Sequence, residues 1–356
     1  MAFSTIDKSL LYQNPVLYTG NASTQSITGV GFQSDLLWIK CRGAVENQAV
    51  YDSVRGDSGQ SSGYYELEPN NDAAEAAGAW NTLVSAIGSD GFSLGNNDQV
   101  NTASTFVAWS WKAGTTTGIA GSPTITPSSY SFNATSGFSI IKYVGNGTAD
   151  ATIPHGLSTA PKMVIIKNLT TQEGWVVGHE GIRGVGLGWT KIMKLNTNAG
   201  ETTSSAYFGN VAPSATLVTI GTDGGVNTNT DNYIAYCFSE VVGYSKMGSY
   251  VGNNNTNGTF TYTGFKPSFV MIKGTYGDWW GMQDDKRDID NVVDKTLYAN
   301  ENDTEYSGAN YYIDFLSNGF KIRTTHSGMN GNGSNYIYTA FGQPIISNSG
   351  VCATAR

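Results

Sequence analysis

The sequence predicts an all-β protein made of three tandem antiparallel β-sandwich domains, jelly-roll-like and of one repeated type. Three observations carry this prediction: helix signals are scarce, short runs of Val, Ile, Thr, Tyr and Phe alternate with Asn-Gly and Asp-Gly turns, and four landmarks recur three times in one order. The best helix candidate, residues 72–80, is short and interrupted by Gly78, so it supports one or two turns at most. The length of 356 residues agrees, because it corresponds to two or three domains.

The first two landmarks are a strand that runs into a turn and a second turn that opens an apolar strand. The first reads Tyr-Thr-Gly-Asn at 18–21 and Tyr-Val-Gly-Asn at 143–146 and 250–253. The apolar strand opens at Gly31, Gly156 and Gly264 and ends in Ile-Lys at Lys40, Lys167 and Lys273. Since its consecutive residues are apolar, we expect this strand to be central and covered on both faces. Its terminal lysine is expected to return to solvent and to have no further role.

The last two landmarks are a late turn and a closing aromatic strand. The turn reads Asp-Gly-Phe at 90–92 and Asn-Gly-Phe at 318–320, with Asp-Gly-Gly at 223–225 as the nearest match in between. The closing strands cover 106–111, 233–238 and 336–341 and contain Trp109, Tyr236 and Phe341. The lysine of the second landmark precedes an alanine of this strand by 68, 68 and 67 residues (40 to 108, 167 to 235, 273 to 340). Four landmarks in register indicate a triplicated unit the size of a small domain.

The landmarks divide the chain into three units with short additions. The predicted parts are an N-terminal arm (1–16), a first sandwich (17–113), a linker (114–129), a second sandwich (130–243), a third sandwich (244–343) and a C-terminal tail (344–356). The linker is rich in Gly, Thr, Ser and Pro and has no charge, so it is either an extended connection or a strand that pairs with a neighbouring chain. A much shorter connection around 242–247 predicts a fixed orientation of the second and third units.

Composition and charge exclude several classes of protein. Charged residues make up 13% of the chain, about half of the ~25% usual in soluble domains. A net charge of −8 and a pI of about 4.9 argue against a nucleic-acid binder. No run approaches the ~20 apolar residues of a membrane span, and no basic start followed by an apolar stretch suggests a secretion signal. Three distant cysteines predict neither a disulfide framework nor a metal site, and they suit a reducing cytoplasm.

Candidate catalytic, cofactor-binding and metal-binding residues are scarce. The three histidines, His155, His179 and His326, form no HxH or HxxxH pair and do not recur at equivalent landmarks. No GxSxG motif is present, and the Gly-rich stretch at 181–188 lacks the GK[ST] ending of a phosphate loop. The sequence therefore predicts no catalytic residue, no cofactor and no metal ion, while a Ser-His-Asp triad formed by distant residues stays open.

The densest group of charges and tryptophans contains Trp279, Trp280, Asp284, Asp285 and Arg287. Paired carboxylates beside aromatic rings are what a glycosidase uses, and an indole that stacks on a sugar would give a ligand or partner surface. A structural role is the favoured reading, because an aromatic residue followed by an acid recurs in the other two units. Each acid precedes an arginine by three residues, which predicts the pairs Asp52–Arg55, Glu180–Arg183 and Asp284–Arg287.

Residues 26–40, 51–56, 90–95 and 107–114 of the first unit closely resemble a domain of tailed bacteriophages. This domain is common in marine and cyanobacterial phages, on virion proteins usually called tail fibre or structural proteins. The resemblance is strong over 17–114 and clear over 230–273, and the C-terminal Ala-Thr-Ala-Arg also looks like members of this group. It implies a virion location, after assembly in the host cytoplasm, and it brings no catalytic residues.

The predicted function is that of a non-enzymatic virion surface protein, a tail fibre or fibre-tip component that binds a host surface glycan or protein. Loops rich in Tyr and Trp offer rigid contact area for this role. The expected partners are other virion proteins and further copies of the chain, as a homotrimer by analogy with fibre geometry. Nucleic acid and membrane insertion are not expected. Two alternatives remain: a capsid decoration, cement or head-fibre protein whose arm is pinned to the shell, and an appendage enzyme that degrades polysaccharide with the acids near 284.

Overall fold

The computed structural model describes residues 4–56, 63–75, 82–182, 189–346 and 352. It contains 42% strand and 7% helix, and its paired strands are antiparallel. The predicted all-β class is therefore confirmed. We describe the chain as a first segment (13–111), a second segment (129–238) and a third segment (245–344), each running from its first strand to its last. Among the described residues, no helix is long and apolar enough to cross a membrane.

Among its described residues, the first segment has two sheets and one short α-helix, and the 3-10 turn η1 (Ser9–Leu11) precedes them. Its elements are β1 (Gln13–Thr19), β2 (Gln25–Thr28), β3 (Leu36–Cys41), β4 (Ala49–Asp52), β5 (Val84–Gly88), β6 (Gly91–Leu94), α1 (Asp98–Asn101) and β7 (Thr105–Trp111). The strand orders are β1-β7-β3-β4 and β2-β6-β5.

The second segment has a larger main sheet, because extra strands join both of its edges. Its elements are β8 (Ser129–Asn133), β9 (Phe138–Val144), β10 (Ala151–Pro154), β11 (Met163–Asn168), β12 (Val176–His179), η3 (Glu180–Ile182), β13 (Lys191–Lys194), β14 (Thr202–Thr203), α2 (Ser205–Phe208), β15 (Leu217–Ile220) and β16 (Asn232–Phe238). The strand orders are β14-β13-β12-β11-β16-β9-β8 and β10-β15.

The third segment again has one large and one small sheet. Its elements are β17 (Ser245–Val251), β18 (Phe260–Tyr262), β19 (Phe265–Gly274), β20 (Gly281–Asp284), β21 (Lys295–Tyr298), β22 (Tyr306–Ser307), η4 (Ala309–Tyr311), β23 (Ile313–Leu316), β24 (Gly319–Ile322), α3 (Ser327–Asn330) and β25 (Asn335–Pro344). The strand orders are β17-β25-β19-β20-β21-β22 and β18-β24-β23.

All three segments share one order in the main sheet. This order is β1-β7-β3-β4 in the first segment, β9-β16-β11-β12 in the second and β17-β25-β19-β20 in the third. In each segment a separate cluster of buried side chains lies between the main and the small sheet. The arrangement is β-sandwich-like, and strands β3 and β11 are buried at every residue, as their apolar runs predicted.

The recurring tyrosine of the first landmark has the same contacts in each segment. The hydroxyls of Tyr18, Tyr143 and Tyr250 donate to the backbone oxygens of Val100, Val226 and Met329 at 2.6, 2.6 and 2.7 Å. Their rings stack on Phe106, Tyr233 and Tyr336 of the closing strands, with centroids 4.9, 5.1 and 5.0 Å apart. The first and fourth landmarks therefore recur because they contact each other.

The glycine that opens the second landmark is required by its backbone. Gly31, Gly156 and Gly264 have φ of +85°, +73° and +84°, in the left-handed region where a side chain is strained. The conformation allows the chain to leave the small sheet and enter the apolar strand of the main sheet.

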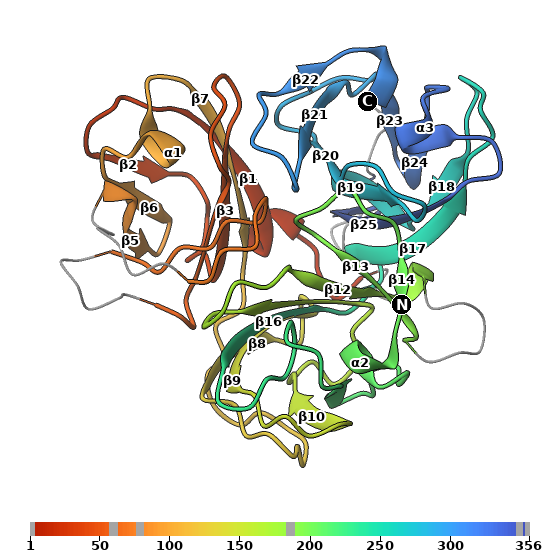
Figure 1. The fold of residues 1–356 in the computed structure, drawn as a ribbon. Coiled ribbons are helices and arrows are strands. Elements are labelled where there is room, and N and C mark those ends of the chain that lie inside the picture. Colours follow the sequence, from red (N-terminus) through yellow and green to blue (C-terminus); the bar gives the residue numbers. More distant parts are fainter. Residues whose placement is uncertain (1–3, 57–62, 76–81, 183–188, 347–351, 353–356) are drawn as a thin grey trace.

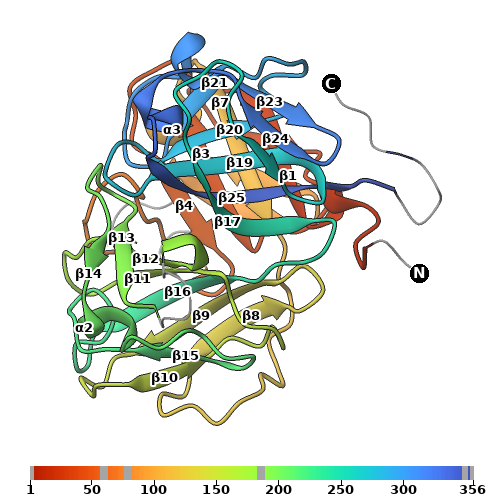
Figure 2. The ribbon, with the colours of Figure 1, turned by 90° about the vertical axis from the view of Figure 1, so that its right-hand side faces the viewer.

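The three segments surround a common core (Figure 1). The face of each main sheet that is turned away from its own small sheet contributes to this core, which includes Trp109, Tyr236 and Phe341. Figure 2, a view turned by 90°, shows the strands of the second segment below those of the other two. The chain ahead of β1 joins this core, since Ile6 is buried and the Tyr12 and Tyr244 rings lie 6.3 Å apart. From Ser4 onward, the expected arm is thus packed and runs into β1 at Gln13.

The stretch at 114–129 is a connection that packs on the second segment of its own chain, because Ile125 is buried and its amide donates to Thr152 O at 3.0 Å. One other expectation differs from the structure. The three lysines that end the apolar strands do not return to solvent, because each is fully buried. Of the candidate helix at 72–80, residues 72–75 are not helical and the rest lie outside the described residues.

Candidate functional site

The contacts between segments hold most of the predicted site residues. We call these contacts the first–third, first–second and second–third joints. Three equivalent positions form each of them: the lysine that ends the apolar strand, the residue just before the next strand of the main sheet, and the fourth residue of the closing aromatic stretch. These three positions of the first segment contact the third segment. Those of the second segment contact the first segment, and those of the third segment contact the second segment.

The lysine ammonium groups join neighbouring segments through backbone oxygens. The acceptors across the joints are Asn302 O for Lys40 (2.9 Å), Asp72 O for Lys167 (3.3 Å) and Thr197 O for Lys273 (3.3 Å). Within their own segments the same groups donate to the oxygens of Glu46, Glu173 and Asp278. Burial lowers the pKa of each lysine to about 8. A buried ammonium surrounded by carbonyl oxygens fixes two loops at once.

The second position places a side-chain N–H against the neighbouring segment. Gln48 Nε2 donates to Tyr298 O at 2.5 Å and to Glu301 O at 3.0 Å. Trp175 Nε1 donates to Glu68 O and Asn71 O at 3.2 and 3.1 Å, and Trp280 Nε1 donates to Lys194 O at 3.0 Å. Trp280, predicted as part of a ligand surface, is therefore a joint residue with 1% of its surface exposed.

The third position contacts the last residue of β4, β12 or β20. Trp109 Nε1 donates to Asp284 Oδ2 at 3.0 Å, and the Tyr236 hydroxyl donates to Asp52 Oδ2 at 2.7 Å. In the second–third joint, Thr339 Oγ1 lies 3.4 Å from His179 Nε2. These contacts complete a closed cycle of three joints inside one chain.

Two of the predicted ion pairs extend the joints. Arg55 Nε lies 2.5 Å from Asp52 Oδ2, and Arg287 Nε lies 2.6 Å from Asp284 Oδ2, with all four side chains shielded from solvent. Both pairs are confirmed. Arg183 lies outside the described residues. Its predicted partner Glu180 pairs with Lys162 at 3.5 Å.

His179 differs from Asp52 and Asp284, the residues at its place in the other two joints, because its Nε2 faces the joint as a donor. Its Nδ1 accepts the amide of Gly181 at 2.9 Å, so the ring proton is on Nε2, which faces Tyr338 O at 3.2 Å. Three residues further on stands Ile182 in place of an arginine, and it is buried. Burial lowers the pKa of His179 to about 4, so the ring is neutral at pH 7.

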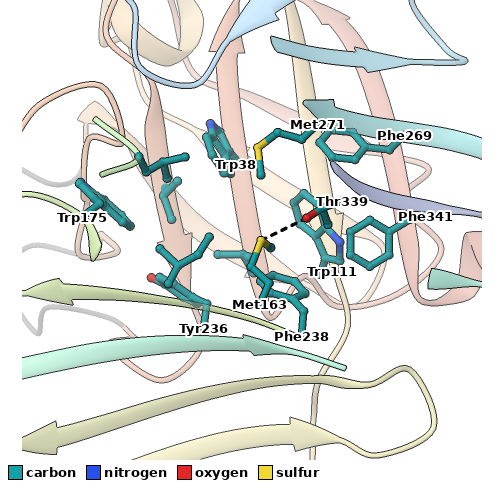
Figure 3. A pocket seen from close by; sticks show the side chains of 14 residues that line it. Trp38, Trp111, Met163, Trp175, Tyr236, Phe238, Phe269, Met271, Thr339 and Phe341 are labelled. Atoms are coloured by element: carbon teal, nitrogen blue, oxygen red, sulfur yellow. Dashed lines mark hydrogen bonds between the residues drawn. The ribbon is translucent and has the colours of Figure 1, made fainter. Parts of the chain in front are cut away.

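The common core encloses a small apolar cavity of about 30 Å³. Figure 3 shows side chains from all three segments around it, among them Trp38, Trp111, Met163, Phe269 and Phe341. The Thr339 hydroxyl, 3.2 Å from Met163 Sδ, is one of the few polar groups in this lining. An apolar cavity of this size is far smaller than a small-molecule site, so it is a packing defect and not a ligand site.

The predicted ligand surface is mostly interior. Trp280, Asp284, Asp285 and Arg287 are at most 8% exposed, and Trp279 alone, with 39% exposed, presents its ring to solvent. Asp284 Oδ1 accepts the amides of Lys286 and Arg287 at 3.0 and 2.9 Å, while Oδ2 accepts Arg287 Nε and Trp109 Nε1. Its oxygens are fully engaged in holding the joint.

Sequence reasoning missed Gln48 and Trp175 as joint residues. A usable signal exists, because they follow Lys40 and Lys167 by eight residues, and Trp280 follows Lys273 by seven. The residues that accept these hydrogen bonds could not be recognised in the sequence. They accept through their backbone oxygens, which every residue type provides. The described residues contain no group of three or more His, Cys, Asp or Glu arranged to hold a metal ion.

The fold and the joints define a β-sandwich-like protein whose three segments close on one another. The chain belongs to the family described as a domain of unknown function, DUF7483, whose model matches residues 8–344. That one model spans all three segments and the residues that lead into β1. No curated protein and no solved structure matches the chain.

Proposed function

We propose that this chain is a non-enzymatic virion protein of a tailed bacteriophage, most simply a tail fibre or fibre-tip component that recognises the host surface. The observation that carries the proposal is the closed cycle of joints, in which buried ammonium, indole and phenol groups fix three segments around one core. The sequence resemblance to phage virion proteins supplies the virion location. A rigid body of this kind suits an appendage that works outside the cell.

The structural unit that goes with this function is one β-sandwich domain present three times. The shared strand order and the repeated tyrosine contacts support this reading. In such a chain a three-fold arrangement already exists within one polypeptide. A homotrimer and contacts with other virion proteins remain part of the proposal. Gel filtration with light scattering of the purified chain measures how many copies associate.

The enzyme alternative loses its main support. The acid that would act beside the tryptophans, Asp284, is buried and bound by Arg287 and Trp109. A general acid or nucleophile must reach the substrate oxygen or carbon, and this carboxylate faces a joint. Asp284→Ala is therefore expected to act on stability, with no released oligosaccharide from host polysaccharide in either form of the protein.

Purified virions of the encoding phage test the proposal. Antibodies against the chain and a virion reconstruction are expected to locate it on the tail, and added purified chain is expected to compete with phage adsorption to host cells. Density on the capsid shell would favour the decoration alternative. Absence of the chain from purified virions would contradict the proposal.

A further inference from the structure

Two carboxylates of the first segment converge on one side-chain amide, apart from the acid–arginine pairs of the joints. Glu66 and Glu68 flank Leu67, which exchanges two backbone hydrogen bonds with Val50 of β4. Leu67 belongs to the common core. Because side chains alternate along an extended chain, both glutamates lie on the other face, where Gln99 of α1 meets them.

The side-chain nitrogen of Gln99 lies among three oxygen atoms. It donates to Glu66 Oε1, to Glu68 Oε1 at 3.2 Å and to the backbone oxygen of Gln48 at 3.1 Å. An amide nitrogen carries two hydrogen atoms, so the three acceptors compete for them. Oxygens of two carboxylates and one carbonyl around a single point are the ligands that a hard cation such as Ca²⁺ prefers.

The negative charge of this site has no direct counter-ion in the chain. Among the described residues, no lysine or arginine forms an ion pair with Glu66 or Glu68, and Arg55, whose charge acts on Glu66, is bound to Asp52 and Glu75. Burial and the charge of Glu68 raise the pKa of Glu66 to about 8. At pH 7 the site therefore holds either a proton or another cation.

A buried hydroxyl beside the carboxylates is a second, independent observation. Since Val50 pairs with Leu67, Tyr51 stands opposite Glu66, and their side chains leave the strands on the same face. Tyr51 is 0% exposed, and its hydroxyl has no hydrogen-bond partner among the described residues. A buried hydroxyl without a partner is costly, and a water molecule bound to a cation at Glu66 would give it one.

The site lies between the two joints that the first segment forms. The backbone oxygen of Glu68 accepts Trp175 Nε1 of the second segment at 3.2 Å. Gln48 Nε2 donates to Tyr298 O and Glu301 O of the third segment. An ion held by the Glu68 carboxylate and by Gln48 O would fix the backbone at both joints at once.

We propose that Glu66, Glu68, Gln99 and the backbone oxygen of Gln48 bind one calcium ion, with the Gln99 amide turned so that its oxygen faces the ion. Calcium suits this irregular set of carboxylate, amide and carbonyl oxygens, whereas magnesium requires a nearly ideal octahedron. The sequence predicted no metal ion, because an amide and a backbone oxygen belong to no His, Cys or acid motif. The proposal is independent of the virion role.

Titration calorimetry of the full chain, freed of metal with EDTA, tests the site with calcium chloride and magnesium chloride. One calcium ion per chain is expected, bound at least about tenfold (~1.4 kcal/mol) more tightly than magnesium. Glu66→Gln and Glu68→Gln are each expected to weaken calcium binding about tenfold or more. Gln99→Glu supplies a third carboxylate and is expected to tighten it. Glu201→Gln makes the same change at an ion pair of the second segment and serves as the matched control.

Thermal unfolding with and without calcium gives a second measurement. Calcium is expected to raise the unfolding temperature of the wild-type chain and of Glu201→Gln, because it binds the folded state, and to leave that of Glu66→Gln unchanged. Without calcium, Glu66→Gln is expected to be at least as stable as the wild-type chain, since it removes a buried acid beside Glu68. Lost binding in this variant is then not a consequence of misfolding.

Two results would overturn the proposal. The absence of any binding heat and of any thermal shift up to about 10 mM calcium would leave Glu66 and Glu68 as two acids that share a proton. Calcium binding that both glutamine variants keep at full strength would place the ion elsewhere in the chain.

Discussion

His179 occupies in the second–third joint the place that Asp52 and Asp284 occupy in the other two. A neutral ring can do there what a carboxylate with its arginine does elsewhere, because its Nδ1 accepts the Gly181 amide and its Nε2 proton faces Tyr338 O. Protonation of Nδ1 would break the first of these bonds and place a charge in a fully buried site. The residue therefore makes one of the three joints sensitive to acid.

The free energy of unfolding is expected to fall as the pH drops from 6.5 toward 5. Burial lowers the folded-state pKa of His155 and His179 to about 4, against the ordinary value of 6.5, so the unfolded chain binds more protons in this window. Each ring contributes up to about 1.4 kcal/mol per pH unit. In urea unfolding curves, His179→Gln and His155→Gln are each expected to lower the slope by up to about 1.4 kcal/mol per pH unit. An unchanged slope in both variants would contradict the assignment.

Lys167 is charged in the folded chain at pH 7, unlike the two histidines, but its effect on stability has the same sign as the pH rises. Burial lowers its pKa to about 8 from 10.5, so the unfolded chain holds the proton more tightly, and stability is expected to rise between pH 8 and 9.5. Lys167→Met is expected to cost about 1–3 kcal/mol, because the oxygens of Asn168, Glu173 and Asp72 lose their donor. The variant should also show a smaller rise with pH. Lys142→Met, outside the joints, is the control and should keep the full rise.

At the scale of elements, the repeat can be recognised in the sequence because a local contact requires the same residue type at each landmark. The glycine of the first landmark follows the stacked tyrosine, and a Cβ on Gly20, Gly145 or Gly252 would overlap the backbone oxygen of Thr102, Thr228 or Gly331. Turns that require glycine and aromatic rings that stack on each other restrict the residue types at their positions, so the sequence shows them. The central apolar strands, the aromatic closing strands and the two acid–arginine pairs could therefore be predicted.

Gly145→Ala is expected to destabilise the chain by about 3 kcal/mol or more, because the new methyl group meets backbone that cannot move alone. Gly29→Ala is the matched control: its φ of +91° strains an alanine, and nothing lies within 4 Å of the added methyl. This control should cost about 1 kcal/mol. Chemical denaturation of both variants gives the comparison, and equal losses would show that steric overlap at Gly145 is not the cause.

The joints could not be predicted in the same way. Asn302, Asp72 and Thr197 receive the lysines through their backbone oxygens, so no side-chain pattern marks them. A lysine after an apolar strand usually returns to solvent, and only the three-dimensional closure of the segments explains why these three are buried. For the same reason the cluster around Trp280 and Asp284 could be read as a surface, although its members face a neighbouring segment.

At the scale of the whole molecule, we expect the three segments to unfold together, because the common core contains side chains from each of them. Damage to one joint should then lower the stability of the entire chain. Asp284→Ala leaves the buried Arg287 without its closest carboxylate and is expected to cost about 3–5 kcal/mol. Asp314→Ala removes a pair with the half-exposed Arg323 and is expected to cost less than about 1 kcal/mol. Thermal unfolding followed by circular dichroism measures both, and similar losses would contradict the structural role of the first–third joint.

Scanning calorimetry of the full chain and of Asp284→Ala tests the closed cycle of joints most directly. We expect one transition whose calorimetric and van't Hoff enthalpies agree, and a single transition at lower temperature in the variant. Two or more resolved transitions in the wild-type chain, or a variant in which only one of several transitions moves, would show that the segments fold independently and would contradict the account.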